Sequence, residues 1–363
     1  MLIDRRQFMR AAGLGFAASL APRALAQAQA TDAVFAAAFQ RRDGAYGAAI
    51  LSEQGKLIAE IALPDRGHDL AFDPAARRTV VFARQPGVFM IIFDHYGQEQ
   101  PISIASAPGR HFYGHGVFSP DGKLLYASEN DFDNAAGVIG VYDATDRFRR
   151  IGEFPTYGVG PHEVVLLDDG RTLAIANGGI ETHPDFGRAE LNIATMQPSF
   201  ALVDRLTGDL LDKRVLPPDL HQLSIRHMDI DQTGVIWFGC QHRGPASETP
   251  LLVGRAPRDG ELKLVDMPAP ALRGFRNYIG SVAANRDAGT IAVSSPQGNA
   301  FAVLEAASGK LLSAVNLDEV CGLAPQKAGF LASTGTGELR TGDNARIETP
   351  DMVWDNHILR LAG

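Results

Sequence analysis

Five of the ten histidines occupy the same place in a phrase that recurs along the chain. The phrase is a short apolar segment, a turn with Asp or Gly, and a second apolar segment, and its histidines are His68, His115, His162, His227 and His357. Imidazoles gathered at one place are typical ligands of copper, iron, zinc or nickel. Two further copies of the phrase place Ser281 and Cys321 at this position. We therefore predict a metal site of five histidines, with the Cys321 thiol as a candidate further ligand.

Bringing these histidines together requires a repeated architecture. The anchor positions are 68, 115, 162, 227, 281, 321 and 357, so the copies lie 36 to 65 residues apart. Between them, segments rich in Val, Ile, Phe and Tyr indicate about four strands per copy, which is the period of a β-propeller blade. The last copy has room for one strand, and the segments 34–40, 45–51 and 56–63 supply three more. We predict an all-β, seven-bladed propeller in which one blade is closed by N-terminal strands plus the C-terminal strand.

The repeat position has two interpretations. The first strand of each propeller blade lines the central channel, so the five imidazoles would form a ring at one channel mouth. Alternatively, a Gly-His pair can serve packing, as in WD-type propellers, and Gly67-His68 and Gly114-His115 have this form. The other three histidines lack the preceding glycine. Five buried imidazoles could not all be protonated at close range, and metal binding uses the neutral form. We favour the metal interpretation.

Polar residues are expected on the same face as the histidine ring. Loops that open there carry the candidate ligand-binding residues Arg84, Glu129, Asn177, Arg226, His242, Arg243, Arg276 and Tyr278. Arginine forks bind carboxylate or phosphate through paired hydrogen bonds, so these residues predict an anionic small molecule or metal chelate. Glu129 and Glu163 are candidate carboxylates for a metal or a general base. A large insertion, 178–198, interrupts one blade near this face.

The first 26 residues have the form of an export signal. A charged start with Arg5-Arg6 precedes an apolar stretch from 11 to 21 and a small-x-small cleavage site at 24–26. Paired arginines followed by x-Phe-Met resemble the twin-arginine (Tat) signal, although an ordinary secretory signal is the alternative. We predict Tat export to the bacterial periplasm, with residues 27–363 forming a single propeller domain. The Tat pathway carries folded proteins, which suits a cofactor loaded before export.

Composition and absent motifs exclude several classes. The chain of 363 residues has 34 basic and 42 acidic residues, and a net charge of −8 argues against nucleic-acid binding. No apolar run approaches the ~20 residues of a membrane span. The sequence has no P-loop and no Cys-x-x-Cys-His, so we expect no nucleotide and no covalent haem.

Several of these phrases together resemble one bacterial family. They are Gly-His-Asp-Leu-Ala-Phe-Asp-Pro at 67–74, Tyr-Gly-His-Gly-Val-Phe-Ser-Pro-Asp-Gly at 113–122, Pro161-His162-Glu163, Arg226-His227-Met228-Asp229 and Trp354-Asp355-Asn356-His357. The chain resembles a domain-of-unknown-function family of Tat-exported propellers, often encoded beside imelysin-type iron-regulated proteins and di-haem oxidoreductase-like proteins. The resemblance implies a seven-bladed fold and partners in periplasmic iron uptake or redox chemistry, but no catalytic residues.

Three functions follow as hypotheses. The first is a periplasmic propeller that binds iron or copper, in iron acquisition or associated redox chemistry. The second is a lactonase-like hydrolytic propeller with a rim histidine or glutamate as base, and it predicts turnover without a transition metal. The third is a protein-interaction scaffold in which the histidines are structural. The sequence leaves open whether the protein is an enzyme.

Overall fold

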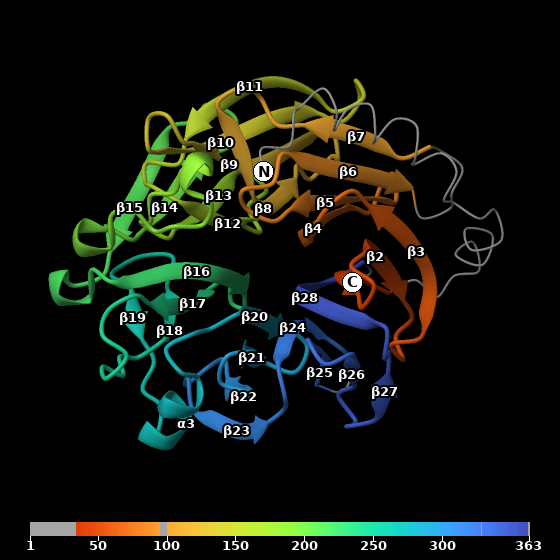
Figure 1. Ribbon diagram of the computed structural model, residues 1–363. Coiled ribbons are helices and arrows are strands. Elements are labelled where there is room, and N and C mark those ends of the chain that lie inside the picture. The colour runs from red at the N-terminus through yellow and green to blue at the C-terminus, as the bar shows by residue number, and fades with distance from the viewer. Residues whose placement is uncertain (1–33, 95–99, 328, 362–363) are drawn as a thin grey trace.

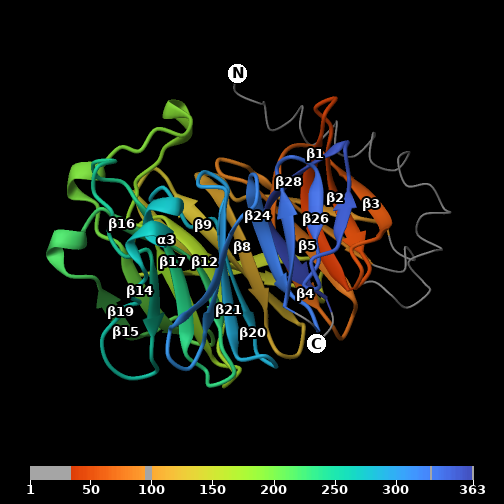
Figure 2. The ribbon, with the colours of Figure 1, turned by 90° about the horizontal axis from the view of Figure 1, so that it is seen from below.

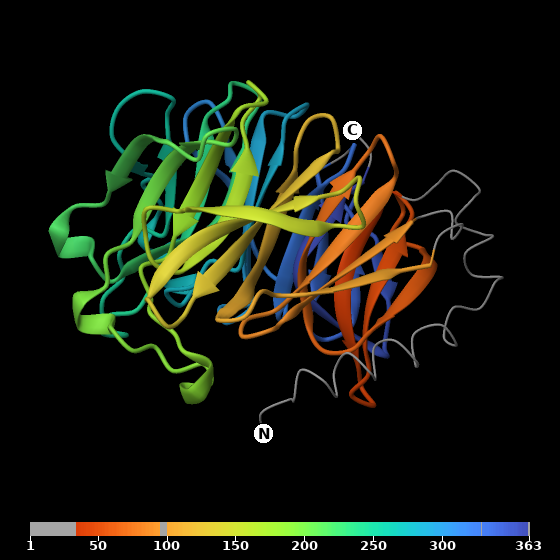
Figure 3. The same cartoon turned by 90° about the horizontal axis from the view of Figure 1, so that it is seen from above.

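Seven four-stranded antiparallel sheets stand around a central axis in the computed structural model (Figure 1). The structure describes residues 34–94, 100–327 and 329–361, so the predicted export signal at 1–26 lies outside the described residues. The predicted seven-bladed propeller is confirmed. Figures 2 and 3 show the disc from its sides, with the inner strands running along the axis.

The first four blades follow one another along the chain. Blade one comprises β4 (Gly67–Asp73), β5 (Arg78–Ala83), β6 (Phe89–Asp94) and β7 (Ile102–Ala105). Blade two comprises β8 (Arg110–Phe118), β9 (Leu124–Asp131), β10 (Ala136–Asp143) and β11 (Arg149–Pro155). Blade three comprises β12 (Pro161–Leu166), β13 (Thr172–Asn177), β14 (Ser199–Asp204) and β15 (Leu210–Val215). Blade four comprises β16 (Leu223–Ile230), β17 (Ile236–His242), β18 (Val253–Ala256) and β19 (Lys263–Leu264).

The remaining blades bring the two ends of the chain together. Blade five comprises β20 (Ser281–Asn285), β21 (Thr290–Ser295), β22 (Ala300–Glu305) and β23 (Leu311–Asn316). Blade six comprises β24 (Val320–Pro325), β25 (Phe330–Thr334), β26 (Glu338–Arg340) and β27 (Arg346–Glu348). Blade seven comprises β28 (Met352–Arg360), β1 (Phe35–Arg41), β2 (Tyr46–Leu51) and β3 (Leu57–Leu63).

Closure of the ring depends on blade seven. β28 pairs antiparallel with β1, with Phe35 opposite Arg360 and Arg41 opposite Met352. The Leu361 amide donates to the Val34 carbonyl at 2.7 Å. The innermost strand of this blade is therefore the last strand of the chain, as the sequence predicted. Both neighbours of the closing blade gain a packed partner, so the ring has no open end.

Apolar side chains between neighbouring sheets form the core. β13 is buried along its whole length, whereas β11 alternates between exposed and half-buried residues. The outermost strand is thus less buried than a strand within the sheet, as expected for sheets packed face to face. One cluster continues through blades three, four and five, with Ala174, Trp237 and Val293 among its members. This packing fixes the inner strands rigidly around the axis.

Helices are short and few in the part of the chain that the structure describes. The predicted insertion lies between β13 and β14 and contains the 3-10 turns η2 (Pro184–Phe186) and η3 (Ile193–Thr195). It projects from one face of the disc (Figure 2, yellow-green). A third turn, η4 (Pro218–Leu220), precedes blade four, and α3 (Ala269–Gly274) precedes blade five. Among these helices, none has the length and apolar character needed to cross a bilayer.

Candidate metal centre

The five predicted histidines meet on the propeller axis. Their rings follow one another in a closed circuit through His68, His115, His162, His227 and His357. Neighbouring ring centroids lie 5.0, 4.7, 4.6, 4.9 and 4.7 Å apart around this circuit. All five side chains are buried. We call this group the histidine ring.

Each of the five inner strands that carry a ring histidine has a bulge at or next to that histidine. The pairing register shifts around His68 in β4, His115 in β8, His162 in β12 and His357 in β28, and directly before His227 in β16. Bulges change the aim of a side chain and are frequent beside functional sites. The inner strand of blade five pairs without a shift and carries Ser281 in place of a histidine. The sequence repeat located the histidines, but it did not indicate the bulges.

Carboxylates behind the ring orient the imidazoles. The Nδ1 of His115 lies 3.0 Å from Asp69 Oδ2, and the Nδ1 of His68 lies 2.8 Å from Asp355 Oδ1. Glu163 lies 3.5 Å from the Nδ1 of His227. An ionised carboxylate only accepts hydrogen bonds, so Nδ1 of His115 and His68 carries the proton. This tautomer leaves the Nε2 lone pair free, as carboxylate–histidine pairs do at metal sites.

Burial keeps most of the ring neutral. Burial lowers the pKa of His68, His162 and His227 well below its usual value, and neighbouring imidazoles lower it further. Burial also lowers the pKa of His357, to about 4. Although burial opposes it, the neighbouring His357 and His115 lower the pKa of Asp69 to about 2. Neutral imidazoles backed by an ionised carboxylate are the protonation states that metal ligands require.

The ring contains buried nitrogen atoms without a hydrogen-bond partner. In the described chain these are Nε2 of His115 and His357, Nδ1 of His162, and both ring nitrogens of His227. A buried polar atom without a partner costs about 1–3 kcal/mol. A bound cation would satisfy several of them at once. The residues therefore fit a metal ion, and two sets have ligand atoms within 4.8 Å of one another: His68, His115 and His162; and His115, His227 and His357.

His115 is the member common to both sets. It is fully buried, and its Nε2 is among the unpartnered atoms. A third set combines His115 with Asp69 and Glu163, again within 4.8 Å. Burial raises the pKa of Glu163 well above its usual value, and the neighbouring Asp69 adds to the effect. We assign Asp69 a supporting role because its carboxylate is already engaged with the Nδ1 of His115.

Two cavities of different character meet the ring. One has a volume of about 230 Å³, and its walls include His68, His162 and His227 together with four arginines, Arg84, Arg188, Arg226 and Arg243. We call it the arginine cavity. The other has a volume of about 590 Å³ and includes Asp69, Glu163, Asp229 and His357, with apolar residues of the inner strands beyond them. The first therefore presents cations beside the ring, and the second presents carboxylates.

Half of the predicted ligand-binding residues line the arginine cavity. They are Arg84, Arg226, Arg243 and Tyr278. Asn177 lies nearby but is buried, and its amide donates to the Thr156 carbonyl at 2.9 Å. His242 is held by Glu248 at 3.0 Å, and Arg276 is exposed outside the cavity.

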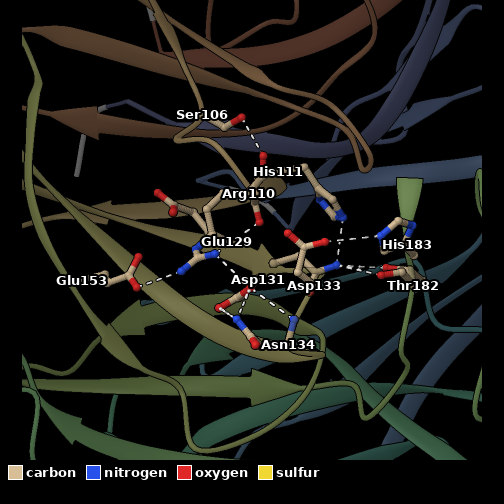
Figure 4. Close-up of polar contacts among 12 residues, drawn as sticks. Ser106, Arg110, His111, Glu129, Asp131, Asp133, Asn134, Glu153, Thr182 and His183 are labelled. Atoms are coloured by element: carbon tan, nitrogen blue, oxygen red, sulfur yellow. Dashed lines mark hydrogen bonds and ion pairs between the residues drawn. The ribbon is translucent and has the colours of Figure 1, made fainter. Parts of the chain in front are cut away.

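Glu129 is a structural residue of blade two. Its side chain is fully buried, receives a hydrogen bond from the Tyr142 hydroxyl at 2.6 Å, and pairs with Arg150 at 2.8 Å. Figure 4 draws Glu129 near the Arg110–Asp131 ion pair, without a contact to the other residues shown. Glu129 is absent from the residues that line either axial cavity. Its predicted role as a metal or base carboxylate therefore has no geometric support.

Cys321 does not join the histidine ring. Its sulfur lies 3.4 Å from the carbonyl and hydroxyl oxygens of Ser333, among apolar side chains between blades six and seven. Burial raises the pKa of this thiol to about 12, which opposes the thiolate form that binds metals. It belongs to none of the candidate ligand sets among the described residues. Cys321 and Cys240 are both free thiols.

Sequence reasoning missed residues that complete the site. Asp69 directly follows His68, and Asp355 lies two residues before His357. These positions in the sequence could have indicated carboxylates close to the histidine ring. Arg188 and Glu190 line the arginine cavity from the insertion. No repeat marks them, because the insertion occurs in only one blade.

Fold and site together define a β-propeller with a buried, carboxylate-backed histidine ring. Within this class, a family model described as "Protein of unknown function (DUF1513)" matches residues 61–361, so the chain belongs to that family. No curated protein matches the chain significantly.

Solved structures support the fold alone. Hydrazine synthase of Kuenenia stuttgartiensis is similar, with a TM-score of 0.61 and 16% identity, over 85% of this chain and 90% of that one. The β-propeller domain of Cps50 (Swd1) from Myceliophteria thermophila has a TM-score of 0.58 and 13% identity, over 90% of this chain and 97% of that one. Identities this low say nothing about activity.

Proposed function

We propose that this protein is a periplasmic metal-binding propeller whose histidine ring holds an iron or copper ion. The observation that carries the proposal is the set of buried ring nitrogens without hydrogen-bond partners. Imidazole ligands suit both metals, and the carboxylates behind the ring supply the orientation that such ligands need. The metal would act in iron acquisition or in redox chemistry with a periplasmic partner.

The arginine cavity gives the proposed metal a class of ligand. Its four arginines lie beside His68, His162 and His227, and one carboxylate, Glu190, shares the cavity with them. An anion bound there would contact the arginines and reach an open coordination position of the metal. We propose an anionic small molecule or a metal chelate as the ligand, because guanidinium groups recognise carboxylates and phosphates.

Elemental analysis of the purified protein tests the metal. We expect near-stoichiometric iron or copper in the wild type and its loss from His115→Gln and His227→Gln variants that keep their circular dichroism spectrum. His221→Gln is the matched control, because His221 is exposed directly after η4 and its ring bonds to the Pro218 carbonyl, away from the histidine ring. Its metal content should equal that of the wild type.

Two results would contradict the proposal. One is wild-type protein without metal, even after reconstitution with Fe(II) and copper. The other is ring variants that lose thermal stability but keep their metal, which would make the histidines structural. Turnover of a lactone by metal-free protein would favour the hydrolytic alternative.

Export is tested separately, since the signal lies outside the described residues. The paired arginines Arg5 and Arg6 support the twin-arginine route. We expect an Arg5→Lys/Arg6→Lys variant to remain in the cytoplasm, whereas wild-type protein reaches the periplasmic fraction. Equal periplasmic yields would contradict this route and favour the ordinary secretory signal.

A further inference from the structure

The charges of the arginine cavity are only half compensated. Arg243 pairs with Glu190 at 3.0 Å. Arg84 lies 3.6 Å from Asp355, a carboxylate that also contacts Arg66 and His68. Across the described residues, Arg188 and Arg226 have no carboxylate within ion-pair distance. Two of the four guanidinium groups therefore lack a counter-ion.

Arg226 shows this deficit most clearly. It stands on β16 directly before His227, and its Nε donates to the Ser224 hydroxyl at 2.9 Å. No further acceptor contacts its guanidinium group within the described chain. Arg226 is half-buried, and an unpaired charge that has lost part of its water is unfavourable, so a bound anion would stabilise this side chain.

Arg188 approaches the same cavity from the insertion. Arg188 is exposed overall, but partial desolvation at the cavity lowers its pKa, and the charges of Arg84 and Arg66 add to the effect. The insertion is tied to blades one and two at Thr182, whose hydroxyl accepts a hydrogen bond from Gln85 at 2.7 Å and whose carbonyl accepts one from Asn130 at 3.0 Å. Figure 4 shows Thr182 and His183 of the insertion against this polar network of blade two. Arg188 therefore stands on an anchored segment.

Size and shape limit the ligand. The cavity volume of about 230 Å³ is below the range of about 300–1,000 Å³ that is common for drug-sized ligands. Tyr113, Tyr278 and Gln241 add neutral hydrogen-bonding groups to the walls. Histidines of the ring line one part of the cavity, and the two unpaired arginines come from β16 and the insertion. A tetrahedral oxyanion would fill only a fraction of this space.

We propose that the arginine cavity binds a small dicarboxylate with two negative charges. One carboxylate group pairs with Arg226 on the side of the cavity nearest the histidine ring, and the other pairs with Arg188 of the insertion. Two negative charges match the two guanidinium groups without counter-ions, whereas a monocarboxylate leaves one unpaired. The placement of the carboxylate nearest the histidine ring rests on the proposed function, because that group would contact the proposed metal.

Calorimetric titration of the full mature protein tests the dicarboxylate. Succinate and malonate are the probes, and acetate and sulfate are the comparison anions, each added to metal-free and to metal-loaded protein. We expect a dicarboxylate to bind about tenfold or more tightly than acetate or sulfate. Arg188→Gln and Arg226→Gln should each weaken that binding about tenfold or more, since each removes a charged hydrogen-bonding partner. Arg149→Gln, in the exposed strand β11, is the matched control and should change nothing.

The outcomes separate this inference from the proposed metal site. If metal-loaded protein binds the dicarboxylates no better than acetate or sulfate, the dicarboxylate proposal is overturned, and the proposed metal centre is unaffected. Dicarboxylate binding by a protein that never takes up metal supports the arginine site and overturns the metal proposal. If Arg226→Gln does not fold, the Arg188→Gln variant still tests the inference, because Arg188 is exposed. An unchanged affinity of that variant for the dicarboxylates overturns the inference.

Discussion

At the scale of single residues, the site depends on a second layer of charge behind the histidines. Asp69 is the clearest member, because it contacts His115 at 3.0 Å and lies 3.9 Å from the Nδ1 of His357. The sequence repeat identified the imidazoles by their common position. Asp69 and Glu163 each directly follow a ring histidine but contact the histidine of the next blade, whereas Asp355 precedes His357 and contacts His68. Only the folded chain therefore shows which carboxylate serves which histidine.

An Asp69→Asn substitution should weaken metal binding without unfolding the protein. The amide lacks the charge that holds the proton on Nδ1 of His115. Loss of such an outer partner typically reduces metal affinity about 10–100-fold. Competition with a chelator of known affinity measures the change. The exposed Asp259→Asn substitution is the control, and equal affinities for the two variants would contradict the assigned role of Asp69.

Acid should destabilise the metal-free protein within a defined pH window. His357 has a pKa of about 4 in the folded protein and about 6.5 when unfolded. Between these values the unfolded chain binds a proton that the folded chain does not. The free energy of unfolding therefore falls as pH decreases from about 6.5 to about 4, by up to about 1.4 kcal/mol per pH unit for this histidine.

Urea unfolding of metal-free protein at several pH values measures this slope. The pKa of His68, His162 and His227 is lowered as well. These three histidines therefore make the free energy of unfolding fall more steeply as the pH decreases. His227→Gln should flatten the slope by removing one titrating group. A stability that does not change between pH 7 and pH 4.5 would show that the imidazoles are not buried in their neutral form.

At the scale of elements, the bulged inner strands determine the geometry of the ring. In β8 the bulge includes Gly114, whose φ is +106°. A Cβ atom at this position would lie 2.6 Å from Cδ2 of His68 on the neighbouring blade. The glycine that precedes His115 therefore has two functions: it adopts a left-handed backbone, and it lets two inner strands approach closely. The packing interpretation of the Gly-His pair is therefore supported at Gly114, and the metal interpretation stays a proposal.

Gly114→Ala should damage both stability and the ring. A side chain at positive φ and the contact with His68 together cost about 1–3 kcal/mol in the free energy of unfolding. Displacement of His68 should also lower metal occupancy. Chemical denaturation and elemental analysis measure the two effects. Gly152→Ala in β11 has free space around its Cβ and should leave both unchanged; equal behaviour of the two variants would contradict this account.

At the scale of the whole molecule, the pairing of β28 with β1 closes the ring and places His357 and Asp355 at the axis.

Removal of residues 352–363 would expose one edge of β1 and uncover the neighbouring blades. We expect low soluble yield and a broad thermal transition, because every blade packs on two others. A circular permutant that joins residue 361 to residue 34 and opens at 317–319 keeps all blades intact. It should fold and bind metal, and a truncated protein as stable as this permutant would contradict the role of closure.

The sequence by itself determined the architecture, because each blade repeats the same hydrophobic pattern and each copy contributes to one core. The repeat placed the three N-terminal strands β1, β2 and β3 within one residue of their observed ends, and it placed the five histidines at one position. The repeat did not mark local irregularities: it gave no sign of the bulges in the inner strands, and it did not show that Cys321 packs between blades six and seven.

Only the tertiary structure decided which polar residues act together. Asp355 reaches His68 across 287 positions of sequence, and Glu163 reaches His227 across 64. The arginine cavity combines residues of different blades with Arg188 of an insertion that has no counterpart elsewhere in the chain. A repeated pattern specifies what all blades share, whereas charge partners and cavities arise between blades, where the shape of the closed ring sets every distance.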